Sequence, residues 1–133
     1  MPSVVADTHA AVWYLLDSPR LSQVARDRMA LTIAGGDPIV VPSICLVELL
    51  YLVEKGRIPR ADWERLQATL DSSDSGYRIA SLDEAVARSV SRVPRDMVPD
   101  MADRIIVATA LQLDLPLVSR DQRIQMTGIE IVW

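Results

Sequence analysis

Short apolar runs that alternate with longer helical segments are the feature that most constrains this chain. The runs at 3–6, 39–41, 77–80, 117–119 and 129–132 are too short for buried helices, and each predicts a strand. Parallel strands need helical crossovers, so this order predicts a parallel sheet with helices on both faces. The expected fold class is therefore α/β, a three-layer α/β/α sandwich around a central, mostly parallel sheet of four to five strands.

The segments between these runs have helical periodicity and recognisable end signals. Ser43 is expected to cap the third helix, with Gly56 at that helix's C-terminal end, and Ser81 is expected to cap the fifth. The predicted helices cover 8–16, 22–34, 44–55, 60–70, the segment up to 90, and 101–113.

Length and composition indicate one globular domain over residues 1–133, with 50% apolar and 24% charged residues. No apolar run reaches the ~18 residues of a membrane span, and no secretion signal is seen. Cys45 is the only cysteine, so an internal disulfide is excluded and a cytoplasmic location is expected. The net charge of −4 argues against nucleic-acid binding by bulk charge, so such binding would need a local basic patch.

Three acidic residues interrupt this apolar pattern. Asp7 follows the first predicted strand and Asp121 follows the fourth, where either could cap the next turn. The carboxyl ends of parallel strands are also where open α/β sheets bind ligands. Glu48 has apolar helical neighbours, so its carboxylate should be partly buried and should need a partner, either an arginine or a cation.

Two further acidic residues lie at the start of the helix 101–113. Asp103 is on the same face as Ile106, Val107 and Ala110, so it is expected to point inward. Asp100 could be the N-cap of this helix, could pair with Arg104 four residues on, or could supply an additional metal ligand.

Carboxylates that converge in one place raise each other's pKa values, so a stable cluster needs a cation. Oxygen ligands without a histidine and cysteine set favour Mg²⁺ or Mn²⁺ over Zn²⁺. Such ions commonly serve phosphoryl chemistry, in which they activate water and neutralise charge on the phosphate.

Four stretches carry a family resemblance in order and spacing: "VVADTHAAVWYL", "VPSICLVELLYLVEKG", "DMADRIIVATALQLDLPLVSRD" and "IEIVW". They are spread over essentially the whole chain, which is similar to PIN-domain ribonucleases and above all to the VapC toxins of bacterial toxin–antitoxin pairs. The resemblance implies divalent-metal-dependent cleavage of RNA, with Mg²⁺ or Mn²⁺ as cofactor. It also implies a homodimer and neutralisation by a small antitoxin protein.

The family's four acids fall on Asp7, Glu48, Asp103 and Asp121, which are therefore expected to be both catalytic and metal-binding. The resemblance also implies that Thr8 and Ser119 are polar neighbours of the metal site.

Arg120 and Arg123 flank Asp121 and are candidates for contact with RNA, as is Arg104, although surface solubility and structural pairing would also explain them. His9 is the only histidine, and a hydrogen bond to the backbone at the helix start is favoured over a catalytic role. Packing is favoured over base stacking for Trp13.

Other functions remain open on the residues alone. These are a non-toxin PIN-like nuclease in RNA processing, a PIN-like fold that only binds a partner, an aspartyl-phosphate phosphatase, and a receiver-like module. The phosphatase normally has a second aspartate two positions after the first, where this chain has His9, and a lysine that Lys55 is poorly placed to supply. A receiver needs an acceptor aspartate after the third strand, which here ends in Ala80 and Ser81. The chain also lacks the glycine-rich nucleotide-binding motifs.

Overall fold

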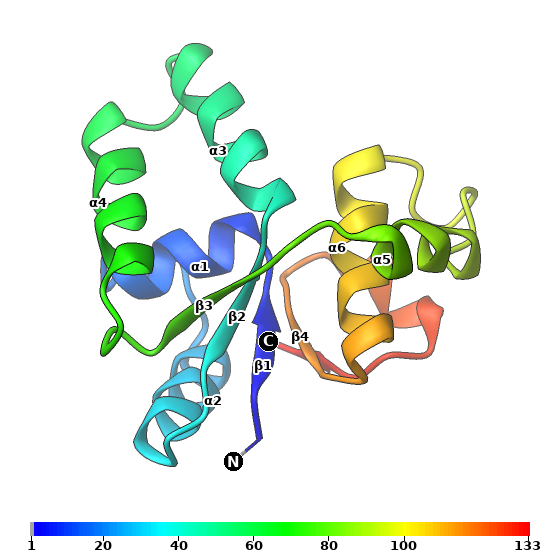
Figure 1. The fold of residues 1–133 in the computed structure, drawn as a ribbon, viewed down its shortest axis with the longest axis horizontal. Coiled ribbons are helices and arrows are strands. Elements are labelled where there is room, and N and C mark those ends of the chain that lie inside the picture. Colours follow the sequence, from blue (N-terminus) through cyan, green and yellow to red (C-terminus); the bar gives the residue numbers. More distant parts are fainter. Residues whose placement is uncertain (1) are drawn as a thin grey trace.

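Five short strands form one sheet in the computed structural model, which describes residues 2–133 except for the side chains at 122, 125 and 126. The sheet order is β3-β2-β1-β4-β5, and every neighbouring pair is parallel (Figure 1). The strands are β1 (Val4–Ala6), β2 (Ile39–Pro42), β3 (Tyr77–Ala80), β4 (Leu117–Val118) and β5 (Ile131–Val132). The predicted α/β class with a parallel sheet is confirmed.

The order of the strands reverses beside β1. Val5 pairs with Val40 of β2 on one side and with Leu117 of β4 on the other. The chain therefore builds β1, β2 and β3 outward in one direction and then crosses to the opposite side for β4 and β5. The carboxyl ends of β1 and β4 lie at this switch point, which is the place where open α/β sheets form their ligand crevice.

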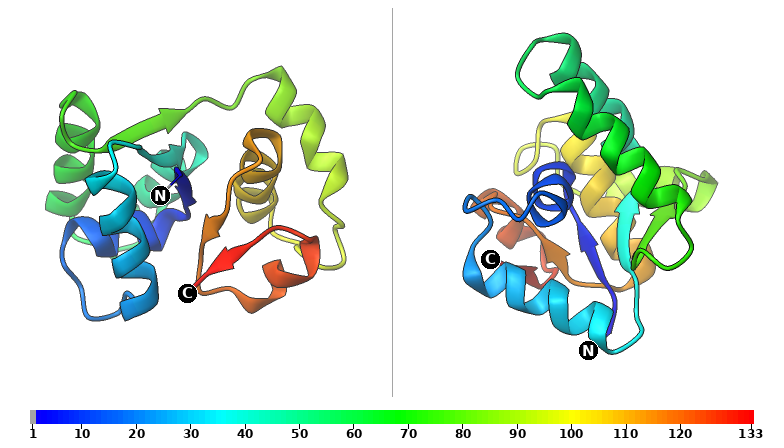
Figure 2. Two further views of the ribbon diagram at one scale, coloured as in Figure 1. Left: turned by 90° about the horizontal axis from the view of Figure 1, so that it is seen from below. Right: turned by 90° about the vertical axis from the view of Figure 1, so that its left-hand side faces the viewer.

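Helices cover both faces of the sheet (Figures 1 and 2). Helices α1, α2 and α4 lie on one side, α5 and α6 lie on the other, and α3 and α4 project together beyond the sheet. None of the helices within residues 2–133 has the length and apolar character needed to cross a bilayer. The helices are α1 (Thr8–Leu15), α2 (Gln23–Ala34), α3 (Ile44–Glu54), α4 (Arg60–Asp71), α5 (Glu84–Ser89) and α6 (Met101–Leu113), with short 3-10 turns at Val90–Arg92 and Gln122–Thr127.

The core holds β1 and α6 in fixed relation. All three residues of β1 are fully buried, and six consecutive residues of α6, 105–110, are buried as well. A helix that is buried all round must pack on more than one neighbour, and α6 indeed contacts both α3 and α5. This packing fixes the start of α6 against the helix that carries Glu48.

Of the two predicted serine caps, Ser43 is correct in position only and Ser81 is wrong. Ser43 has helical backbone angles and makes no side-chain cap; its backbone N–H donates to Ala80 O at 2.9 Å, and its hydroxyl instead accepts from the backbone N–H of Leu82 at 3.0 Å. Asp83, not Ser81, caps α5, because Asp83 has the extended backbone of an N-cap and accepts from Val86 N at 2.9 Å. The remaining bounds differ from the prediction by a residue or two, most at β5, which begins at Ile131 rather than 129.

Candidate metal centre

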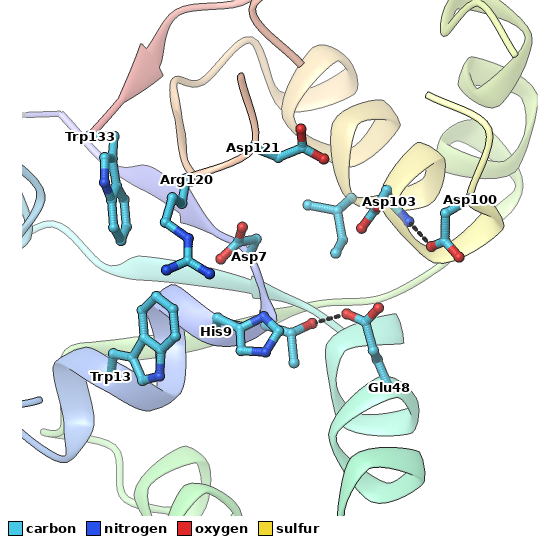
Figure 3. Close-up of a pocket in the computed structure, with 11 residues that line it drawn as sticks. Asp7, His9, Trp13, Glu48, Asp100, Asp103, Arg120, Asp121 and Trp133 are labelled. Atoms are coloured by element: carbon cyan, nitrogen blue, oxygen red, sulfur yellow. Dashed lines mark hydrogen bonds between the residues drawn. The ribbon is translucent and has the colours of Figure 1, made fainter. Parts of the chain in front are cut away.

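An open cavity of about 490 Å³ lies at the carboxyl ends of β1 and β4 (Figure 3). All four acids singled out in the sequence line it, and so does Asp100. The structure therefore brings together side chains from two strand ends and two helices that are far apart in sequence.

Asp7 serves the fold and the cavity at once. Its Oδ1 accepts a hydrogen bond from the backbone N–H of Ala10 at 2.9 Å, so Asp7 is the N-cap of α1. Burial raises the pKa of the Asp7 carboxyl above its ordinary value, and hydrogen bonding from the Ser119 side chain opposes that rise. Asp7 can therefore cap α1 and line the cavity at the same time.

Glu48 is held by a threonine and not by an arginine. The buried hydroxyl of Thr8 donates a hydrogen bond to Glu48 Oε1, linking the start of α1 to α3. No ion pair among residues 2–133 includes Glu48, so the expected alternative of a partner arginine is wrong. Glu48 is half-buried and its carboxylate faces the cavity (Figure 3).

Glu48, Asp100 and Asp103 form an acidic trio. Each offers one carboxylate oxygen, and these three atoms lie within 4.8 Å of one another. Asp100 also caps α6, because its Oδ2 accepts from the backbone N–H of Asp103 at 3.0 Å. Burial, followed by repulsion from Asp100 and Glu48, raises the pKa of Asp103 to about 7.

The acidic trio fits a hard divalent cation. Its donors are all carboxylate oxygens, the ligand type that Mg²⁺ and Mn²⁺ prefer. A cation there would also offset the mutual repulsion that raises the pKa of Asp103. Asp7 and Asp121 line the same cavity but lie outside the trio, whereas Asp100, expected only as an additional ligand, lies within it.

Asp121 is already paired. Arg123 donates from Nε to Oδ1 at 3.2 Å and from Nη2 to Oδ2 at 3.0 Å, and the backbone N–H of Arg123 also donates to Oδ1. These contacts lower the pKa of Asp121 below its ordinary value. Ser119 supports the same turn, since its hydroxyl accepts from the backbone N–H of Asp121 at 3.1 Å.

The other arginine candidates lie in different surroundings. Arg104 donates to the carbonyl oxygens of Val90 and Val93, so its predicted pairing with Asp100 is wrong. The Arg104 guanidinium thereby ties α6 to the 3-10 turn at Val90–Arg92, where the Val90 carbonyl also accepts from the backbone N–H of Val93 at 3.0 Å. Arg120 is exposed, lines the cavity, and places its guanidinium carbon 5.1 Å from the centre of the Trp13 ring.

Trp133, which was not among the predicted site residues, also lines the cavity. The strand order would have indicated the position of Trp133. Val132 of β5 pairs with Val118 of β4 in parallel, so the residue after β5 emerges at the same edge as Ser119. Trp133 packs against Trp13 there, with ring centres 6.1 Å apart.

Comparison with known proteins agrees with this architecture. A family model described as the PIN domain matches residues 4–129. The chain is 30% identical over 129 residues to Ribonuclease VapC22 of Mycobacterium tuberculosis (strain ATCC 25618 / H37Rv), covering 94% of this chain and 92% of that protein.

Solved structures share the fold at lower identity. The VapBC2 complex of Rickettsia felis, bound to a DNA fragment from its promoter, gives a TM-score of 0.71 at 15% identity, covering 97% of this chain and 96% of that one. The DNA-bound VapBC of Salmonella typhimurium gives 0.66 at 20% identity, covering 98% and 97%.

Proposed function

The chain belongs to the PIN-domain family, and we propose that it is a divalent-metal-dependent endoribonuclease that acts as the toxin of a toxin–antitoxin pair. The observation that carries this proposal is the acidic trio, set in a cavity that Asp7 and Asp121 also line. The name of the curated relative, a ribonuclease, supports RNA as the substrate.

In this proposal the acidic trio holds Mg²⁺ or Mn²⁺, and the other side chains orient the trio and the substrate. When bound, the cation activates water and neutralises charge on the phosphate. Thr8 fixes the rotamer of Glu48, and the capping bond of Asp100 fixes the first turn of α6. Asp7 and Asp121 line the cavity beside the trio and would accept hydrogen bonds from the attacking water.

We further propose that a small antitoxin protein covers an apolar groove beside the cavity. The groove runs between α3 and α6 and shares Glu48 and Asp100 with the cavity. Val47, Tyr51 and Met101 line it and are exposed. An apolar helix with a basic residue at one end would match both the groove and the adjoining carboxylates. Tyr51→Glu should then abolish neutralisation by a co-expressed antitoxin while RNA cleavage continues.

The proposed homodimer has a candidate interface on α2. Val24 and Leu31 are 61% and 54% exposed and are seven residues apart, so they lie on the same face of the helix. Leu31→Glu should convert a dimer to a monomer in light scattering. Leu113→Glu, at an exposed leucine of α6, is the matched control and should leave the dimer intact.

The direct test is cleavage of RNA by the purified protein. EDTA should stop the reaction and Mg²⁺ or Mn²⁺ should restore it, and the downstream fragment should carry a 5′-phosphate. Asp7→Asn should be inactive although it keeps a capping side chain. Equal activity in EDTA, or a 2′,3′-cyclic phosphate product, would contradict the proposed mechanism. Growth arrest on expression, relieved by the co-expressed antitoxin, tests the toxin role separately.

A further inference from the structure

The cavity has two chemically different walls (Figure 3). Glu48, Asp100 and Asp103 lie on one side, and Trp13, Arg120 and Trp133 lie on the other, which we call the Trp–Arg wall. Asp7 and Asp121 lie between the two walls. An RNA strand that extends across the cavity from the acidic side would therefore lie against the Trp–Arg wall.

Arg120 differs from the other arginines near the site. Arg104 is bonded to backbone carbonyls and Arg123 is paired with Asp121. Within the described part of the chain, Arg120 belongs to no ion pair, although carboxylates line the same cavity. Arg120 is an exposed residue, and its guanidinium lies over the Trp13 ring instead.

Trp13 supports this guanidinium. Trp13 is only 7% exposed, so its ring is a fixed support, and a cation over an indole face is attracted by the ring's quadrupole. His9 and Trp133 pack on Trp13 at ring-centre distances of 5.2 Å and 6.1 Å. Trp133 is half-buried, so part of its indole stays accessible in the cavity lining.

Most of the charged groups that line this cavity are carboxylates, which repel the phosphates of RNA. A cation at the acidic trio would neutralise only the phosphate beside it, so a neighbouring phosphate needs another positive group. An arginine already oriented by stacking suits this role, because its planar fork binds phosphate oxygens in pairs. Aromatic side chains beside such an arginine are the usual stacking surface for unpaired bases.

We propose that the Trp–Arg wall is a nucleotide-binding subsite for single-stranded RNA, in which Arg120 binds a phosphate next to the one that is cleaved and Trp133 stacks on a base. This subsite rests on the proposed ribonuclease function. It predicts that Arg120 contributes to substrate binding and that the acids on the other wall carry out the cleavage step.

Steady-state cleavage of a short single-stranded RNA tests the subsite. Arg120→Ala should raise KM about tenfold or more and leave kcat within about twofold. The slope of log(kcat/KM) against log[salt] should become shallower by about 0.7, the value for one lost single-strand phosphate contact. Arg65→Ala, at an exposed arginine of α4, removes the same charge away from the cavity and should change neither KM nor the slope.

Two more variants separate the contribution of the Arg120 charge to RNA binding from those of its planar shape and of base stacking. Arg120→Lys should keep the salt slope but still raise KM, because lysine cannot stack as a planar fork. Trp133→Leu should raise KM about fivefold or more through lost base stacking. Thermal melting checks that each variant folds.

The outcomes distinguish this inference from the proposed function. If the wild type cleaves RNA and Arg120→Ala has the KM and salt slope of Arg65→Ala, the subsite is wrong and the nuclease assignment stands. An unchanged KM in Trp133→Leu overturns the stacking role. If the wild type does not cleave RNA with any divalent metal, the proposed function fails and the subsite fails with it.

Discussion

Thr8 donates its hydroxyl hydrogen to Glu48, a residue 40 positions further along the chain. The bond joins the first residue of α1 to the middle of α3, and Thr8 itself is buried. A carboxylate held in this way has one oxygen occupied and one free to face the cavity. Mutation of residues that orient a ligand in this manner commonly costs about 10–100-fold in metal affinity or activity.

Removal of this hydroxyl should impair the site without unfolding the protein. Thr8→Val keeps the shape of the side chain but leaves Glu48 without its donor. We expect a loss of about 1–2 kcal/mol in stability and a 10–100-fold weaker apparent metal affinity. Thr8→Ser should restore both. Chemical denaturation and metal titration of RNA cleavage measure the two effects, and wild-type metal affinity in Thr8→Val would contradict the role.

Replacement of Asp103 and of Asp100 by asparagine should have different effects. Asp103→Asn should abolish cleavage, because the inward carboxylate is a proposed ligand with no substitute. Asp100→Asn keeps a capping side chain, so stability should change by less than about 1 kcal/mol. Since Asp100 belongs to the acidic trio, this variant should need more Mg²⁺ for half-maximal cleavage. Isothermal titration with Mn²⁺ tests this, and an unchanged affinity would exclude Asp100 as a ligand.

The contribution of Asp103 to the stability of the metal-free protein should fall as the pH rises from about 4 to about 7. The pKa of Asp103 is raised to about 7 in the folded state, so the folded state binds this proton more tightly than the unfolded state does. The resulting destabilisation is absent below the unfolded pKa and complete above the folded one. Because Asp103 is half-exposed, we expect roughly 1–2 kcal/mol after allowance for solvent screening.

Thermal melting in EDTA across this pH range measures that loss. Asp103→Asn should flatten the profile and should be more stable than the wild type at pH 8. Added Mg²⁺ should raise the wild-type melting temperature most at high pH, where Asp103 is ionised. A wild-type profile without metal that has the same pH dependence as that of Asp103→Asn would contradict the assigned shift.

Arg104 should prove structural, although it lies beside Asp103. Its guanidinium binds the carbonyls of Val90 and Val93 and so ties α6 to the preceding turn. Arg104→Met should lose about 1.5–3 kcal/mol of stability. Its KM for RNA should remain close to that of the wild type under conditions where it is folded. A KM shift as large as that of Arg120→Ala would instead place Arg104 on the substrate.

Sequence reasoning succeeded where local signals and tertiary structure agree. The bounds of α6 match the prediction, because Asp100 supplies the cap at one end and Asp114 adopts a left-handed conformation after the other. The predicted side-chain cap failed at Ser43. This residue directly follows β2, which is paired with β3 up to its last residue, and its hydroxyl is bonded to the segment after β3. There the tertiary partner, Leu82, outcompeted the local cap.

The strand order predicts that the acidic residues gather at one edge of the sheet. It does not predict which three of them lie closest together. Asp100 comes near Glu48 only because α3 packs against α6, a contact between segments about 50 residues apart. The pairing of Asp121 with Arg123 and the stacking of Arg120 on Trp13 also depend on rotamers that sequence spacing leaves open.

The placement of β4 beside β1 has a consequence for biosynthesis. The first strand of the sheet cannot gain its second neighbour until residue 118 has left the ribosome, because Ala6 pairs with Val118. Asp7, Ser119 and Asp121 meet only after that late, long-range pairing, which is slow compared with helix formation. A nascent chain can thus form most of its helices while its cavity is still open on one side, and chemistry that depends on this cavity begins only after β4 has paired with β1.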